Sequence, residues 1–386
     1  MKFRIFAMLA MLLAAVFSIA GCGGSGGSAA TGTQIVSKGV ITGFGSVFVN
    51  GVEFDIPVSA NIILDDATAS SDNLKTGMVV KVKGTLNNGG TTGSAASIEY
   101  EDSLEGPVSN LTANGFSILN QDVLTTTTTV YVGVTGLSGI TNGQFVEVSG
   151  LMNPDGIITA TRIETKSSTE YKIRGTVSNL GTNTFVLTVR PGLDYRVDFS
   201  SGTITILPSF ADLKDGAFVK VSASAAPTGG TTIMATKVSV KRADIEDADR
   251  AEVEGFVSNY NSSAHTFSIN NINVDAASII LPTGFTDGIR IEVEGKLANG
   301  LMTAVKLVRE KDSNQEVQGA VTAKTGSTMT IGGTLVTVTS TTMYLDSSTA
   351  NDRLIGFASI AINDLVDVKG YLDDAGNFIA VRIERK

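Results

Sequence analysis

Three short sequence patterns recur in the same order five times, and this repetition constrains the fold more than any other feature of the chain. Each unit opens with Gly-x-[Val/Ile]-[Ser/Thr], continues with a strand of alternating apolar and charged residues, and closes with Ala-x-x-[Ile/Val/Leu]. The opening glycines are Gly39, Gly106, Gly175, Gly255 and Gly319, and the closing alanines are Ala95, Ala160, Ala235, Ala304 and Ala380. Units of roughly 65 to 80 residues have room for five or six strands of ordinary length.

The middle pattern predicts half-buried strands. Val80 and Val82 alternate with lysines and the run ends at Gly84, which is the arrangement of a strand with one face in a core and the other in water. Asn50-Gly51 and Asn299-Gly300 predict type I′ hairpin turns, because both residues tolerate positive φ.

We therefore expect an all-β fold of about five tandem modules. An exposed sheet edge invites aggregation, so each module is expected to close into a small OB-like barrel with its anchor glycines at sharp bends. An immunoglobulin-like or other two-sheet sandwich is the alternative for each module. A single transmembrane barrel is disfavoured, since the chain has no tryptophan and only 7 tyrosines for interfacial girdles.

The repeats place the predicted module boundaries. The expected parts are a signal peptide at 1–21, a lipidated cysteine and flexible Gly/Ser tether at 22–36, and modules at 37–102, 103–168, 169–246, 247–312 and 313–386. The junctions between modules are too short to be free linkers, so neighbouring modules are expected to touch.

The N-terminus has the form of a secretory signal peptide. Charged Lys2 and Arg4 precede an apolar run from Ile5 to Ala20, which is shorter than the ~20 residues that a membrane-spanning helix needs. The end of this run, Ile19-Ala20-Gly21-Cys22, resembles the bacterial lipobox.

The lipobox resemblance implies lipidation of Cys22. In that process the cysteine thiol takes a diacylglycerol, the chain is cleaved before Cys22, and the new N-terminus receives a fatty acid such as palmitate. Two or three acyl chains anchor a protein stably at a membrane, whereas one does not. Gly23 follows the cysteine where aspartate would indicate retention, so resemblance to Gram-negative lipoprotein sorting favours the outer membrane.

Composition excludes several functions. Loss of residues 1–21 removes Lys2 and Arg4 and changes the formal charge from −9 to −11, which disfavours nucleic acid as a partner. Cys22 is the single cysteine, so no internal disulfide or cysteine-based metal cluster is expected. His265 is the single histidine and lies in a predicted turn, so a Ser-His-acid triad and a histidine zinc site both lack residues. We expect neither enzymatic activity nor a cofactor.

Acidic residues supply the remaining candidates for chemistry. Paired carboxylates support glycoside hydrolysis, and the adjacent pairs are Asp65-Asp66, Glu101-Asp102 and Asp373-Asp374. Adjacent acids at turns and strand ends are more simply interpreted as a solvated face. The candidate calcium ligands are Asn153, Asp155, Asp373, Asp374 and Asn377, although hairpin turns use the same residue types for backbone reasons.

From about Ser37 to Lys386 the chain resembles a bacterial family of repeated β-barrel domains, found in secreted proteins and lipoproteins and known only as a domain of unknown function. The resemblance rests on the three repeated patterns, from which the third repeat departs with Ala223 in place of glycine. It supports the fold and implies no activity.

The leading hypothesis is a non-enzymatic envelope lipoprotein at the outer membrane, a scaffold or binding surface for envelope proteins or polysaccharides. The alternatives are a surface lipoprotein that binds a glycan or calcium and, third, a carboxylate-dependent hydrolase.

Overall fold

Five sets of strands pair in the same cyclic order along the chain. The structure is a computed structural model, which describes residues 32–386 apart from 44–45, 168, 202–203, 242–244, 283, 310–314, 340–341, 347, 349–352 and 374. Regular structure in these residues consists of β-strands and four short 3-10 helices. None of the helices described is long and apolar enough to span a membrane.

We call the five sets barrels 1 to 5. Barrel 1 contains β1 (Thr33–Gly43), β2 (Val47–Val49), β3 (Val52–Asp55), β6 (Val79–Leu86) and β7 (Thr92–Tyr100). Barrel 2 contains β8 (Leu104–Pro107), β9 (Gly115–Ile118), β10 (Gln121–Val132), β11 (Phe145–Met152) and β12 (Ile158–Thr165). Barrel 3 contains β13 (Tyr171–Ser178), β14 (Thr184–Arg190), β15 (Leu193–Asp198), β17 (Phe218–Ala223), β18 (Thr232–Met234) and β19 (Lys237–Lys241). Barrel 4 contains β20 (Ala248–Asn261), β21 (Thr266–Ile269), β22 (Ile272–Asp275), β23 (Arg290–Ala298) and β24 (Leu301–Arg309). Barrel 5 contains β25 (Gln315–Thr325), β26 (Thr328–Ile331), β27 (Thr334–Thr337), β30 (Leu365–Leu372) and β31 (Phe378–Arg385).

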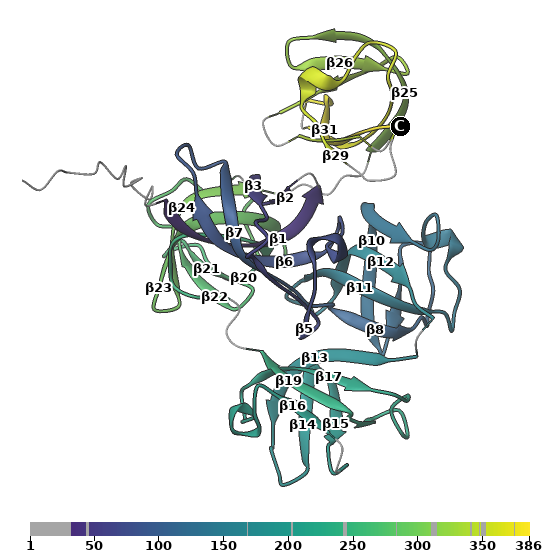
Figure 1. The fold of residues 1–386 in the computed structure, drawn as a ribbon, viewed down its shortest axis with the longest axis vertical. Coiled ribbons are helices and arrows are strands. Elements are labelled where there is room, and N and C mark those ends of the chain that lie inside the picture. Colours follow the sequence, from purple (N-terminus) through teal and green to yellow (C-terminus); the bar gives the residue numbers. More distant parts are fainter. Residues whose placement is uncertain are drawn as a thin grey trace, which may run out of the picture. The chain divides into compact units, whose positions relative to one another are not determined.

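Within a barrel the strands follow the order 1-2-3-5-4-1, and the third strand runs parallel to the fifth. In barrel 5, β25 pairs with β26 and β30, and the parallel pairing of β27 with β31 completes the ring. Figure 1 shows β25, β26 and β31 curving around one axis. Barrels 1 and 4 close in the same way. In barrel 2 the last gap is closed by a bridge between Ser109 and Ser117. The predicted all-β fold of small five-stranded barrels is confirmed.

A further segment follows the third strand in four barrels and pairs in parallel with the outer half of the fifth. These segments are β4 (Asn61–Leu64), the second half of β10, β16 (Thr205–Leu207) and β28 (Met343–Asp346). Two of them form hairpins, β4 with β5 (Ala67–Thr68) and β28 with β29 (Arg353–Leu354). A 3-10 helix then leads to the fourth strand: η1 (Ser71–Asn73), η2 (Leu137–Gly139), η3 (Phe210–Asp212) or η4 (Phe357–Ser359).

The glycine that ends the alternating strand is required by close strand contact. At Gly84, Gly150, Gly295 and Gly370 the pairing with the closing strand shifts register, and an added Cβ would overlap a backbone carbonyl oxygen of that strand. This is a β-bulge that only glycine fits. Barrel 3 has Ala223 here, and its pairing ends at Ser222 with Lys237, so its fifth strand is split into β18 and β19. The predicted role of the glycines at barrel bends is confirmed.

The barrel interiors are filled by the apolar residues of the alternating pattern. Val80, Val82 and Ile98 of barrel 1 are each at most 1% exposed. Barrels 2 and 3 share one continuous apolar core, while barrels 1, 4 and 5 each have their own. The predicted type I′ turns are also present, since Asn50, Gly51, Asn299 and Gly300 all have positive φ.

We expect Gly370→Ala to lower the free energy of unfolding by about 1–3 kcal/mol, because the new methyl group overlaps the carbonyl of Ile379. Gly356→Ala in the same barrel is the control: its φ is −98°, and nothing lies within 4 Å of the added Cβ. Urea denaturation of the purified proteins measures both effects. Equal stability of the two variants would contradict the proposed close contact.

Candidate functional site

Acidic residues of barrel 1, of the connection that follows it and of the first strand of barrel 2 meet basic residues of barrel 3 in a group that we call the junction cluster. Its acids are Asp65, Asp66, Glu101, Asp102 and Glu105, and its cations are Lys172, Arg174, Lys220, Lys237 and Lys241. The β4–β5 turn, the connection from β7 to β8 and β8 itself supply the acids, while β13, β17 and β19 supply the cations. A further acid, Glu170 of barrel 3, lies 3.7 Å from Lys172.

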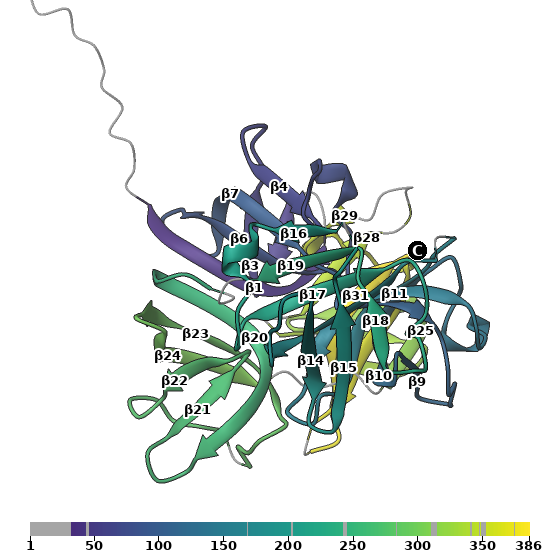
Figure 2. The same cartoon turned by 90° about the horizontal axis from the view of Figure 1, so that it is seen from below.

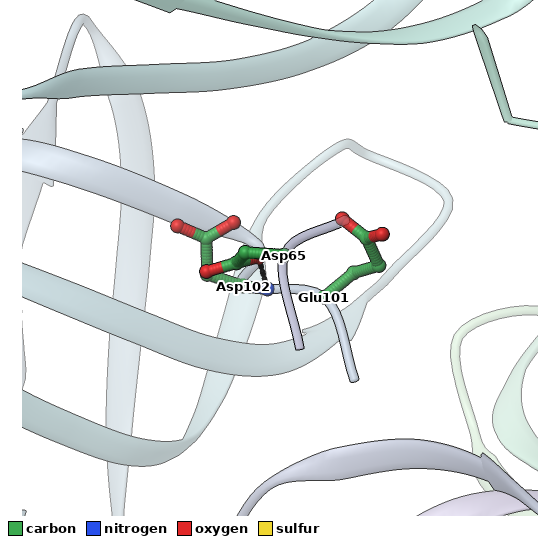
Figure 3. Close-up of side chains that lie close together, drawn as sticks. All are labelled: Asp65, Glu101 and Asp102. Carbon is green, nitrogen blue, oxygen red and sulfur yellow. Dashed lines mark hydrogen bonds between the residues drawn. The ribbon is translucent and has the colours of Figure 1, made fainter. Parts of the chain in front are cut away.

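Local backbone structure positions the carboxylates of Asp65, Asp66 and Asp102. Asp65 and Asp66 occupy the two central positions of the β4–β5 turn, with φ of 50° and 68°, a conformation that aspartate tolerates better than most residues. The backbone N–H of Asp102 donates to Oδ1 of Asp65 at 3.1 Å. Figure 3 shows Asp102 beside Asp65, and the carboxylate of Glu101 on the opposite side.

Lys220 lies at the centre of the junction cluster. Its side chain is 2% exposed, and its Nζ lies 2.7 Å from Asp65, 2.5 Å from Glu101 and 3.4 Å from Asp102. Lys172 approaches Asp102 at 3.0 Å and Glu105 at 2.8 Å. A buried ammonium group among carboxylates is stable only when its charge is matched in this way.

Lys241 and Lys237 complete the contact on the turn. Lys241 bridges Asp66 at 2.6 Å and Glu101 at 2.5 Å, and Lys237 contacts Asp66 at 2.7 Å. The hydroxyl of Ser239 donates to the same carboxylate at 2.6 Å.

Burial and neighbouring charge separate the acids electrostatically. Burial raises the pKa of Asp102 to about 7, helped by the negative charge of Asp65 and opposed by Lys220 and Lys172. Burial also acts to raise the pKa of Asp65, but Lys220 and Lys172 outweigh it and hold that pKa well below its ordinary value. The pKa of Lys220 is raised, because the surrounding carboxylates exceed the effect of burial.

Among the residues that the structure describes, two groups of acids come close enough to share a metal ion: Asp65 with Glu101 and Asp102, and Asp102 with Glu105 and Glu147. Lysine ammonium groups already neutralise the first group. In the second, Glu147 accepts a hydrogen bond from Tyr100 at 2.9 Å and pairs with Lys166 at 3.0 Å. A cation would have to displace these partners, so the geometry favours a structural ion-pair network.

A second junction joins barrels 1 and 4 through a parallel strand pair. β1 and β20 run side by side from Ile35 opposite Arg250 to Lys38 opposite Val253. Glu252 is buried in this seam, where it accepts hydrogen bonds from Ser37 at 3.3 Å and Arg250 at 2.7 Å. Burial, reinforced by Glu294 and opposed by Arg250, raises the pKa of Glu252 to about 7.

Barrels 1 and 2 are joined by hydrogen bonds between side-chain hydroxyls of barrel 2 and the backbone of barrel 1. The hydroxyl of Thr161 donates to the carbonyl of Gly77 at 2.6 Å, and the N–H of Val79 donates to the Ser149 hydroxyl at 2.9 Å. Between barrels 2 and 3, the Tyr195 hydroxyl donates to the carbonyl of Leu119 at 2.7 Å. The prediction that neighbouring modules touch is confirmed for barrels 1 to 3.

Two of the candidate calcium ligands, Asn153 and Asp373, accept hydrogen bonds from backbone N–H groups of their own turns. Asn153 Oδ1 accepts from the N–H of Ile157 at 2.9 Å. Asp373 Oδ1 accepts from the N–H groups of Ala375 and Asn377 at 2.9 and 2.8 Å. Asp155 is exposed in the first of these turns, while Asp374 lies outside the described residues, as do Ile19, Ala20, Gly21 and Cys22. Calcium binding and lipidation therefore stay predictions.

The interpretation of the acidic pairs as a solvated face was wrong for two of them. Asp102 is fully buried and Asp65, Asp66 and Glu101 are at most 24% exposed, because another barrel covers them. The part that Lys172 and Lys220 play here was not predicted from the sequence. Their positions in alternating strands indicate only that they point out of their own barrel.

A shallow depression of about 480 Å³ lies in barrel 4. Its lining includes Tyr260, His265, Ile280 and Phe285, and the rings of Tyr260 and Phe285 meet edge to face at 4.8 Å. His265 is exposed in the β20–β21 turn with φ of 54°. No further titratable residue lines the depression, so it offers apolar contact and one imidazole.

Comparison with known families matches four of the barrels. A family model described as "Domain of unknown function (DUF5666)" matches residues 38–99, 105–164, 174–239 and 318–384. No curated protein matches the chain. The expected five family repeats are thus corrected to four. Barrel 4 lies outside the matches although its strands pair in the same order, and it is the barrel whose described residues lack the additional parallel segment.

We expect Lys220→Met to destabilise the protein by about 3–5 kcal/mol, because it leaves buried carboxylates without their shared cation. The loss should be larger at pH 8 than at pH 6, since protonation of Asp102 removes one unpaired charge. Lys296→Met is the matched control, as its ion pair with Asp249 is exposed and should contribute less than about 1 kcal/mol. Urea denaturation at both pH values tests this, and similar losses for the two variants would contradict a central role for Lys220.

Glu252 predicts a pH dependence of stability. Its pKa is raised in the folded chain, so the folded state binds the extra proton between pH 4.5 and about 7, and the free energy of unfolding falls as pH rises through that window. Glu252→Gln mimics the protonated form. We expect it to match the native protein at pH 5 and to exceed its stability by about 1–3 kcal/mol at pH 8. Denaturation curves from pH 5 to 8 measure this, and a less stable variant at pH 8 would refute it.

Proposed function

The chain belongs to the DUF5666 family through four of its barrels, and from that premise we propose that it is a non-enzymatic, lipid-anchored scaffold of the bacterial cell envelope. The observation that carries the proposal is the junction cluster. Its carboxylates, which are the residues best suited to hydrolytic chemistry, are neutralised by lysines of another barrel. These carboxylates connect modules, whereas the carboxylates of a hydrolase would have to be accessible to substrate.

A scaffold benefits from fixed spacing between modules. Buried ion pairs hold barrel 3 against barrel 1, and a parallel strand pair holds barrel 4 against barrel 1. Stacked modules of this kind offer extended surfaces to envelope proteins or polysaccharides. The proposed anchor is Cys22, in the lipobox-like Ile19-Ala20-Gly21-Cys22, and the proposed location is the outer membrane of a Gram-negative cell.

We expect the native chain, expressed in a Gram-negative host, to incorporate an alkyne-labelled palmitate and to fractionate with the outer membrane. Cys22→Ala should remove the label and the membrane attachment, because it removes the thiol that takes the diacylglycerol. Ser25→Ala in the adjacent tether is the control and should behave as the native chain. Labelling of Cys22→Ala, or its cleavage and membrane binding at native levels, would refute the anchor.

The scaffold role is tested by isolating the lipidated protein from gently solubilised membranes of its native host. Mass spectrometry and glycan analysis should find a specific envelope protein or polysaccharide with the native chain. Lys220→Met, which loosens the junction cluster, should retain less of it. A hydrolytic activity that disappears on Asp65→Asn or Asp102→Asn would instead favour an enzyme.

A further inference from the structure

Barrel 4 has an open strand edge where the other four barrels have a covered one. In those barrels a segment of the chain runs parallel along the outer half of the fifth strand. In barrel 4, β22 pairs with Leu301–Thr303 of β24 and goes no further. Figure 2 shows β22 and β23 on either side of β24. Along Ala304–Arg309, the edge of β24 that faces away from β23 pairs with no strand in the described part of the chain.

The open edge follows from a short connection. Residues 276–289 link the third and fourth strands of barrel 4, against 56–78 in barrel 1 and 338–364 in barrel 5. The described residues of 276–289 form no strand, and Ile280 is 98% exposed. On β24 itself Val305 is 63% exposed and Leu307 is half-buried. The residues equivalent to Leu307 in the other barrels, Ile98, Ile163, Val238 and Ile383, are fully buried.

We propose that this edge of β24 binds an extended segment of a partner protein as an added parallel strand. An unpaired row of backbone N–H and C=O groups is the template for such β-augmentation. The four covering segments of the chain itself indicate which sequence this edge can bind. Each of them pairs in parallel with the same part of a fifth strand in its own barrel.

The covering segments define the central residue of the partner. Ile62, Tyr131, Ile206 and Tyr344 lie opposite Ile98, Ile163, Val238 and Ile383 respectively. The position opposite Leu307 should therefore carry isoleucine or tyrosine, whose side chain would cover the half-exposed leucine.

Charge defines a second position. In barrel 5, Arg385 lies two residues after Ile383 and pairs with Asp346 of β28, its neighbour in register. Arg309 holds the same place two residues after Leu307 in β24. The partner should therefore carry an acidic residue two positions after its isoleucine or tyrosine.

The chain's own segments do not fit this edge. The covering segments already pair with their own closing strands, so a second copy offers no spare strand of this pattern. Ser278–Leu281 forms no strand, and Leu281 and Pro282 stand where the acidic residue belongs. We therefore assign the edge to a separate polypeptide. This inference makes the proposed scaffold role more specific, and it rests on that proposal only for the location of the partner in the cell envelope.

Cysteine trapping tests the edge without a membrane, so its outcome is separate from that of the lipidation experiment. The protein is the whole mature chain with Cys22→Ser, in which Lys306→Cys supplies the single thiol. The probe is a peptide with the sequence of residues 341–348 in which a cysteine, activated as its 2-pyridyl disulfide, replaces Met343, the residue paired with the equivalent of Lys306, Arg382. Ser97→Cys in barrel 1 is the matched control, because β4 already covers that position.

We expect the thiolate of Lys306→Cys to form the mixed disulfide, with release of pyridine-2-thione, about tenfold faster than that of Ser97→Cys, since docking raises the local concentration of the peptide disulfide. A peptide with Asp346→Lys should lose about tenfold in rate, and Arg309→Glu should recover it for that peptide. Equal rates at the two cysteines, or indifference to the charge exchange, would overturn the proposal. Disulfide-linked dimers of Lys306→Cys formed without peptide would overturn it too, by assigning the edge to a second copy.

Discussion

Closure of the barrel depends on one strand that must be paired along both edges. The fifth strand lies antiparallel to the fourth on one side and parallel to the third on the other. Both contacts fit only where the strand bends, and the bend brings backbone so close that no Cβ is accommodated at positions such as Gly370. The alternating core, the hairpins and the additional parallel segment all follow from the need to pair the backbone groups along both edges of the fifth strand.

The charged junction follows from the same closure. A closed barrel directs every second side chain outward, so Lys172 and Lys220 point away from their own core. Where another barrel covers that face, the cations lose water and need carboxylates close by. Asp65 provides one from the β4–β5 turn, which lies at the end of the sheet that contains barrel 1. The resulting ion pairs fix the position of barrel 3 against barrel 1. They also carry the free-energy cost of removing charged groups from water, which a solvated face would not have.

The sequence determined the barrels well because their signals are local. Alternation, turn residues and the bulge glycine each lie within a few residues of the structure that they specify, and even the exception at Ala223 coincides with a split strand. The junction was not predictable in this way. From the sequence, Lys220 is expected to be a solvated residue between two core valines. No neighbouring residue in the sequence indicates that Asp65 of another barrel will pair with it in a buried contact. Contacts between modules depend on surface shape, which periodicity does not encode.

The exception in barrel 4 has the same physical origin as the open edge of β24. A shorter connection after β22 leaves out the segment that covers the closing strand in the other barrels. Barrel 4 is also the barrel that lies outside the family matches. A bare edge next to exposed Val305 and Ile280 is an aggregation hazard, which proteins ordinarily remove. Retaining four covered edges and one open edge within a single chain is economical if the open edge has a strand of another protein to accept.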